Sequence, residues 1–227
     1  MCILSKGIEE LCKRDENIKT LIAPEKIETL ISYIKEIETF NPAYGLVGTS
    51  DRNELIIKHI LDSLAPLGII SRFLGDRMHS IPPKRIADAG SGAGLPGIPL
   101  AIALSDCDFT LIERMGRRAG FLLNTKAVLS IQNINIEEKE LERVTGAFDL
   151  ITFRAFKPLE PKLLKTLLKL CAPKGIIAAY KGRREKIDEE MSVLQKSNTN
   201  KLQWEAVPCP VPFLDEERHL LIIHSCL

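Results

Sequence analysis

Arg85-Ile-Ala-Asp-Ala-Gly-Ser-Gly-Ala-Gly-Leu-Pro-Gly97 is the stretch around which this chain is organised. The short apolar run that begins at Ile86 predicts a strand, and the alternating glycines after it predict a tight turn. Proline is accepted in the first turn of a helix, where the amide it lacks would be unpaired. We therefore expect a strand, a glycine turn and a helix, with room for a ligand against bare backbone near the positive end of that helix.

Three interpretations of this turn remain open from the residues alone. Gly92-Ala-Gly-Leu-Pro-Gly97 fits the G-x-G-x-x-G fingerprint of dinucleotide-binding proteins. Two details favour S-adenosylmethionine instead: Gly90 follows the strand acid Asp88 by two residues, and the glycines alternate directly from the strand end. That arrangement resembles the first motif of class I methyltransferases. A turn that binds no ligand is the third interpretation, because a glycine fingerprint alone is a weak signal.

The bulk composition predicts one domain with an appendage. The chain has 227 residues, of which 45% are hydrophobic and 27% charged, and its net charge is +1. Because the net charge is so small, nucleic-acid binding would need a local basic patch. The cysteines form no C-x-x-C pair and the histidines do not cluster, so we expect reduced thiols and no metal site. With neither a signal peptide nor a membrane-spanning run, we expect a cytoplasmic protein.

The N-terminal part of the chain predicts a helical cap. Apolar residues recur on one face of the segment 24–39, which predicts a helix, and an earlier helix is expected over 3–11. Asn41-Pro-Ala-Tyr-Gly45 predicts a break. A second cap helix is expected from Asn53 to Leu64, with Asp51 as its N-cap.

From Arg85 onward, strands and helices alternate, which predicts a doubly wound sheet. The expected strands are 85–89, 108–113, 134–136, 148–154, 175–181, 203–207 and 220–224. Seven strands that end in an antiparallel hairpin resemble the class I methyltransferase fold. The expected fold class is therefore α/β: a Rossmann-like, mostly parallel sheet of seven strands in residues 81–227, with residues 1–80 as a helical cap packed on it.

Four residues at or after the ends of three expected strands are candidates for cofactor binding. Glu113 lies about 20 residues beyond the glycine turn, where an acid can accept hydrogen bonds from ribose hydroxyls, although a solvated acid is the alternative. Leu141 and Glu142 follow the third strand, where such a sheet can place an adenine ring, and a surface loop is equally consistent. Arg154 ends the fourth strand and suits either a ligand site or a salt bridge at the core edge.

Basic residues gather at the same predicted edge of the sheet. Arg117 lies in a cluster just after Glu113, Lys181 ends the fifth strand, and Arg218 precedes the last strand. A basic rim at this edge would suit a phosphate backbone. The alternatives are a solvated helix start at the cluster of Lys181, Arg183 and Arg184, and residues that merely flank a strand at Arg218.

Five motifs, in order, resemble one family, the small-subunit ribosomal RNA methyltransferase G family, also called glucose-inhibited division protein B. The motifs are Lys58-His-Ile-Leu-Asp-Ser-Leu64, Ala89-Gly-Ser-Gly-Ala-Gly-Leu-Pro-Gly-Ile-Pro-Leu100, Phe153-Arg-Ala-Phe156, Tyr180-Lys-Gly182 and Glu217-Arg-His-Leu220. The resemblance covers roughly residues 25 to 225. The first two motifs together are far more specific than the glycine turn alone.

The resemblance implies S-adenosylmethionine-dependent methylation of guanine N7 in the 530-loop region of bacterial 16S rRNA, with the rRNA or the small ribosomal subunit as partner. The resemblance, together with the glycine turn and the ribose-binding acid, gives one set of cofactor contacts. They are Gly90, Gly92, Gly94, Leu95, Glu113, Leu141, Glu142 and Arg154. The basic positions it implies for RNA are Arg117, Lys181 and Arg218. It implies no metal and no acid–base catalyst, because N7 carries a lone pair and no proton.

The chain departs from the family pattern in the cap and around the cofactor residues. Gly45-Leu-Val47 replaces the usual Asn-Leu-Thr, Arg114 replaces a small residue, and Glu140 replaces a frequent basic residue. Three other functions share parts of the pattern. A small-molecule methyltransferase shares the fold, a dinucleotide oxidoreductase shares the glycine turn, and a non-catalytic module could bind RNA without methylating it.

Overall fold

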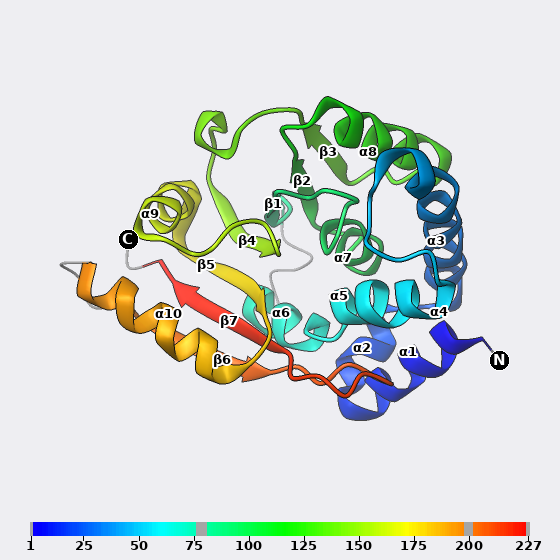
Figure 1. The fold of residues 1–227 in the computed structure, drawn as a ribbon, viewed down its shortest axis with the longest axis horizontal. Coiled ribbons are helices and arrows are strands. Elements are labelled where there is room, and N and C mark those ends of the chain that lie inside the picture. Colours follow the sequence, from blue (N-terminus) through cyan, green and yellow to red (C-terminus); the bar gives the residue numbers. More distant parts are fainter. Residues whose placement is uncertain (1, 76–80, 198–201, 226–227) are drawn as a thin grey trace.

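One twisted sheet runs through the centre of the molecule (Figure 1), a computed structural model that describes residues 2–75, 81–197 and 202–225. Its strand order is β3-β2-β1-β4-β5-β7-β6. The strands are β1 (Arg85–Ala89), β2 (Asp108–Ile112), β3 (Ile134–Glu137), β4 (Phe148–Arg154), β5 (Cys171–Lys181), β6 (Trp204–Pro208) and β7 (His219–His224). The expected seven-stranded sheet is confirmed.

The strand directions bring the candidate residues to one edge. The first five strands pair in parallel, whereas β7 runs antiparallel to β5 and to β6. Lys181 at the end of β5 is therefore the register partner of His219 at the start of β7. The carboxyl ends of the parallel strands and the segment before β7 meet at this edge, where such sheets bind ligands.

Helices cover both faces of the sheet. They are α1 (Ile3–Arg14), α2 (Glu16–Leu21), α3 (Pro24–Tyr44), α4 (Arg52–Leu55), the π-helical η1 (Ile56–Leu61), α5 (Asp62–Leu64), α6 (Leu67–Leu74), α7 (Gly97–Ala103), α8 (Gly116–Val128), the short 3-10 helix η3 (Leu141–Arg143), α9 (Pro161–Leu170) and α10 (Arg184–Ser197). Among the residues described, no helix is both long and apolar enough to cross a membrane.

Two apolar cores result, one on each face. The first joins the cap helices with α7, α8 and one face of the strands, and it includes Leu30, Ile60 and Leu111. The second joins α9 and α10 with the opposite face, and it includes Leu167, Met191 and Ile177. Because the cap and the sheet share the first core, the cap is held against the sheet by burial of apolar surface.

The predicted break after residue 39 was wrong by several residues, because α3 continues through Pro42 to Tyr44. The helix ends at Gly45, whose φ of 58° is left-handed. The side chain of Asn41 then holds the following loop, accepting a hydrogen bond from Val47 N and donating one to Thr49 O. The short helices α2 and α6 were not predicted, and the expected second cap helix contains the π-helical segment η1.

Candidate active site

The glycine turn joins the end of β1 to α7. Gly90, Gly92 and Gly94 all have positive φ angles, of 73°, 57° and 91°. The amides of Gly90 and Ser91 both donate to Ile112 O, so the turn is anchored to the end of β2. This backbone path favours glycine because residues with a Cβ rarely adopt it.

Glu113 lies beneath the turn and holds its shape. Its Oε2 accepts a hydrogen bond from Gly92 N at 2.9 Å, and its Oε1 accepts one from Met115 N at 2.8 Å. Only 5% of the residue is exposed. Since each carboxylate oxygen can accept two hydrogen bonds, both oxygens keep acceptor capacity for a pair of ribose hydroxyls. The acid therefore fits the role predicted for it.

A cavity of about 530 Å³ opens beside the turn, and we call it the cofactor cleft. Four of the predicted cofactor residues line it: Gly90, Glu113, Leu141 and Glu142. The lining residues that were not predicted for this role are Ile112, Arg114, Met115, Arg118, Lys139, Glu140, Ala155, Phe156, Lys157 and Lys162. The buried Leu141 supplies an apolar wall and the exposed Glu142 supplies acceptors, which is the combination expected around an adenine ring.

Phe156 covers part of the glycine turn. A Cβ added to Gly90 would lie 2.0 Å from Cδ2 of this ring. Only a glycine at this position therefore leaves room for the ring. The ammonium group of Lys157 lies 5.1 Å from the centre of the same ring. A ligand placed over Gly90 would therefore meet an aromatic side chain as well as backbone.

Asp88 is buried under the same turn. Its Oδ2 accepts a hydrogen bond from Gly97 N at 3.1 Å, and its Oδ1 has no partner among the described residues. Burial raises the pKa of Asp88 to about 7, although the hydrogen bond from Gly97 N opposes that effect. The carboxyl group is therefore a structural element of the turn whose charge depends on pH.

A second cavity of about 460 Å³ adjoins the cofactor cleft, and Ala155 and Lys157 line both. We call it the basic cavity, because most of its ionisable lining side chains are cationic or imidazole groups. They are Lys58, His59, Arg154, Lys157, Lys181, Arg218 and His219, and Asp62 is the single acid among the lining residues described. Two residues predicted to bind RNA, Lys181 and Arg218, thus line the same cavity.

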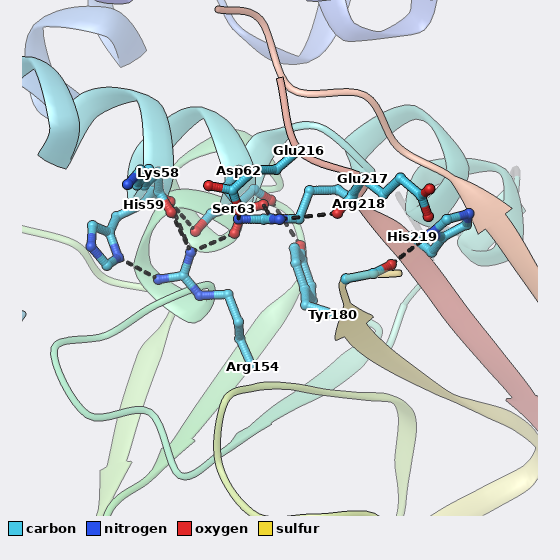
Figure 2. A network of polar contacts seen from close by, with 11 residues as sticks. Lys58, His59, Asp62, Ser63, Arg154, Tyr180, Glu216, Glu217, Arg218 and His219 are labelled. Carbon is cyan, nitrogen blue, oxygen red and sulfur yellow. Dashed lines mark hydrogen bonds and ion pairs between the residues drawn. The ribbon is translucent and has the colours of Figure 1, made fainter. Parts of the chain in front are cut away.

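A polar network in the basic cavity ties the cap to the sheet (Figure 2). Nη1 of Arg154, at the end of β4, donates to Asp62 Oδ2 at 2.6 Å and to Lys58 O at 3.1 Å. Nη2 of Arg154 lies 3.0 Å from His59 Nδ1. Nε of Arg218 donates to the other oxygen of Asp62 at 3.2 Å. One buried acid therefore binds two arginines from different parts of the chain.

Further hydrogen bonds close the network. Tyr180 Oη donates to Ser63 O at 2.8 Å, which links β5 to the cap, and burial raises the pKa of this tyrosine well above its usual value. Burial, helped by the positive charge of Arg154, lowers the pKa of His59 from 6.5 to about 4. At neutral pH the histidine is therefore uncharged beside a permanent cation.

The remaining predicted residues lie elsewhere. Gly92, Gly94 and Leu95 form the turn itself, and Gly94 and Leu95 are buried within it. Arg154 lines the basic cavity rather than the cofactor cleft, and it forms a salt bridge at the core edge with Asp62. Its predicted cofactor contact stays a prediction.

The predicted RNA-binding residues differ in how freely they face solvent. Arg117 is exposed on α8, with its guanidinium 5.9 Å from the centre of the Tyr44 ring. Lys181 forms a salt bridge with Glu190 at 2.7 Å. Arg218 is paired with Asp62 and with Glu216. A phosphate would compete with a carboxylate at Lys181 and Arg218 but not at Arg117.

No function was predicted from the sequence for four residues that the structure places in the two cavities, namely His59, Asp62, Phe156 and Tyr180. All four lie in the motifs Lys58–Leu64, Phe153–Phe156 and Tyr180–Gly182, so the signal for them was present. In the described residues, no group of three or more His, Cys, Asp or Glu side chains could hold a metal ion.

The comparison of sequences identifies close relatives. The model of the family rRNA small subunit methyltransferase G matches residues 26–221. The ribosomal RNA small subunit methyltransferase G of Treponema denticola is 39% identical, and the match covers 98% of this chain and 94% of that protein. The protein of the same name in Treponema pallidum is 38% identical over 89% of this chain and 87% of its own length.

Solved structures share the fold at low sequence identity. A methyltransferase dependent on S-adenosylmethionine from Aquifex aeolicus superposes with a TM-score of 0.55 and 14% identity, covering 85% of this chain and 97% of that one. A protein from Methanococcus maripaludis, described as a methyltransferase of the same type, also has a TM-score of 0.55, with 16% identity over 84% and 90% of the two chains. Both confirm the class I methyltransferase fold.

Proposed function

Since the chain belongs to the rRNA small subunit methyltransferase G family, we propose that it methylates N7 of a guanine in the 530-loop region of bacterial 16S rRNA. Membership of this family makes the chain an S-adenosylmethionine-dependent methyltransferase of small-subunit rRNA. The methylated atom, guanine N7, and its location in the 530-loop region are what we propose. The observation that carries the proposal is the meeting of two cavities at Ala155 and Lys157. Four of the eight predicted cofactor residues line one cavity, and the other cavity is basic.

The cofactor cleft supplies binding and orientation. We propose that Glu113 accepts hydrogen bonds from the ribose hydroxyls and that Leu141 and Glu142 contact the adenine. The glycine turn, with Leu95 behind it, would present backbone to the methionine part. Bound S-adenosylmethionine supplies an activated methyl group on a positively charged sulfur.

The basic cavity supplies a place for the guanine. N7 of guanine carries an in-plane lone pair and no proton, so the transfer requires no general base, and we assign none. The chain would accelerate the reaction by holding N7 in line with the methyl group and by excluding water. Arg154, at the junction of cap and sheet, stays a proposed contact to the cofactor.

The decisive experiment is methyl transfer to small-subunit rRNA. Purified protein would be incubated with radiolabelled S-adenosylmethionine and either naked 16S rRNA or small subunits that lack N7-methylguanine. The labelled nucleotide would then be mapped by the strand cleavage that N7-methylguanine permits after reduction and aniline treatment. We expect label at one guanine in the 530-loop region, and the two substrates decide between naked RNA and the assembled particle.

The alternatives are distinguished by the transfer assay together with measurements of thermal stability and RNA binding. Transfer to metabolites but not to RNA would indicate a small-molecule methyltransferase. Thermal stabilisation by a dinucleotide but not by S-adenosylmethionine would indicate an oxidoreductase. RNA binding without transfer would indicate a non-catalytic module. Label at an atom other than guanine N7 would contradict the proposed target and leave the family assignment intact.

A further inference from the structure

The imidazole of His59 has a fixed tautomer. Its Nδ1 lies 3.0 Å from Nη2 of Arg154, and a guanidinium can only donate hydrogen bonds. Nδ1 must therefore accept, which leaves the single proton of the neutral ring on Nε2. The low pKa of His59, about 4, keeps the ring neutral at physiological pH.

The partner that fixes this tautomer is itself held in place. Arg154 donates to Asp62 and to the carbonyl oxygen of Lys58, and its side chain is only 14% exposed. An arginine stays protonated at any pH at which the protein folds. Nδ1 of His59 is therefore a permanent acceptor, and Nε2–H is a permanent donor.

The remaining donor of His59 is available to a ligand. The ring lines the basic cavity, and its Nε2 forms no hydrogen bond with any residue that the structure describes. The neighbouring cations are already engaged by acids, Lys181 by Glu190 and Arg218 by Asp62. Figure 2 shows the histidine at the end of the network, with its other nitrogen directed away from Arg154.

We propose that Nε2–H of His59 donates a hydrogen bond to O6 of the target guanine and so selects guanine over adenine. The inference rests on the proposed function, because it concerns the base that is methylated. O6 is the acceptor next to N7 on the same edge of guanine, whereas adenine presents an amino donor there. A donor facing a donor would be left unpaired, which is costly in a partly enclosed cavity.

A single neutral donor also suits the reaction. Arginine and lysine usually bind guanine at both O6 and N7, which would block the atom to be methylated. The imidazole has only one proton to offer, since its other nitrogen faces Arg154. His59 can therefore contact O6 and leave the lone pair of N7 free.

Two substitutions separate this contact from a structural role. In His59→Gln the amide nitrogen replaces Nε2, so the donor is kept and the acceptor for Arg154 is lost. In His59→Asn the amide oxygen replaces Nδ1, so the acceptor is kept and the donor is lost. We expect kcat/KM for RNA to fall on the order of tenfold in His59→Asn, the effect of one lost hydrogen bond, and to fall less in His59→Gln.

A structural role predicts the opposite order. If His59 only supports Arg154, then His59→Gln loses more activity and thermal stability than His59→Asn, and that result would overturn the inference. Thermal unfolding of both variants accompanies the kinetics. The wild-type protein is the reference: no transfer to small-subunit rRNA contradicts the proposed function, whereas normal transfer with an unaffected His59→Asn contradicts only the assignment of His59.

A substrate change tests the same contact from the RNA side. RNA that carries 2,6-diaminopurine at the mapped guanine replaces O6 with an amino group and keeps N7. We expect the wild-type protein to prefer guanine over this base and His59→Asn to lose most of the preference. An equal preference in both proteins would show that another group recognises O6.

Discussion

The three glycines of the turn are required for different reasons. A side chain at Gly94 would meet Ile98, and one at Gly90 would meet Phe156. At Gly92 the nearest atom to an added Cβ is Nη1 of Arg118, 3.8 Å away, so there is room in the protein. Gly92 is therefore required by its backbone angle and by the ligand we place there.

Gly92→Val is expected to lose S-adenosylmethionine binding and to cost ~1–2 kcal/mol in free energy of unfolding, the penalty of a left-handed residue. Gly45→Val is the matched control. Its φ is 58° against 57° for Gly92, and an added Cβ has no neighbour within 4 Å. Calorimetry and urea unfolding on both variants test this. Equal cofactor binding by the two variants would argue against a ligand at the turn.

Asp88 and His59 make the stability depend on pH in opposite ways. Asp88 has a pKa near 7 in the fold against 3.8 ordinarily, so it favours folding below pH 4 and loses that effect as the pH rises to 7. His59 has a pKa near 4 in the fold against 6.5 ordinarily, so it favours folding above pH 6.5 and loses that effect as the pH falls to 4.

Asp88→Asn is therefore expected to become more stable relative to the wild-type protein as the pH rises from 4 to 7, because the variant has no carboxylate to ionise in the core. Urea unfolding at several pH values measures the difference. A constant difference across this range would show that Asp88 is not protonated in the fold.

At the scale of elements, the decisive contact joins η1 and α5 of the cap to the ends of β4 and β5. Arg154 reaches two backbone carbonyls of η1, those of Lys58 and His59, as well as the side chain of Asp62. The cap is thereby fixed against the edge of the sheet that carries both cavities.

Asp62→Asn is expected to reduce the free energy of unfolding by about 3 kcal/mol, because two arginines lose the charge of a buried partner. Glu54→Gln is the control, since its pair with Lys58 is exposed and its loss should change little. Thermal and urea unfolding compare the two variants. Similar stability of both would show that the buried network does not hold the cap.

Element boundaries were predictable where local residues determine them. β1 has its predicted bounds, because a short apolar run ends at a glycine turn. The end of α3 was predicted too early. Proline at position 42 indicated a break, whereas the helix ends at the left-handed Gly45. The helix α6 was missed although its pattern is helical, because Leu67, Ile70 and Leu74 recur on its buried face while Arg72 is exposed.

At the scale of the whole molecule, the net charge is small but the cationic side chains are unevenly distributed. The net charge is +1, yet cations gather around the basic cavity. Arg117 is exposed, whereas Lys181 is paired with Glu190. RNA phosphates must replace such acids, so a few residues should dominate the salt dependence of binding.

If Arg117 and Lys181 each contact a phosphate, their double alanine variant should make the slope of log affinity against log salt shallower by ~1.4 to 1.8. The control removes Arg85 and Lys169, exposed residues at the opposite edge of the sheet, where β1 begins and α9 ends. Arg85 lies over the Phe148 ring much as Arg117 lies over Tyr44. Equal slopes for both double variants would refute the RNA-facing edge.

The division into residues 1–80 and 81–227 stays a prediction. Its boundary adjoins residues 76–80, which lie outside the described part of the chain. Tyr33 Oη donates to Ala93 O from α3 to the glycine turn, and Arg14 donates to Pro210 O. Cap and sheet also share one apolar core, so we expect residues 81–227 alone to expose apolar surface and fold poorly.

By itself the sequence determined the alternation of strands and helices from Arg85 onward, the glycine turn and the acid Glu113 behind it, because these follow from backbone preferences and from spacing along the chain. Only the tertiary structure decided which charged side chains are paired with an opposite charge and which are not. Arg154 and Asp62 are 92 positions apart, and Arg218 and Asp62 are 156 apart. Such pairs form because packing of the cap brings them into one low-dielectric cavity, where an unpaired charge is costly. No local pattern carries that information.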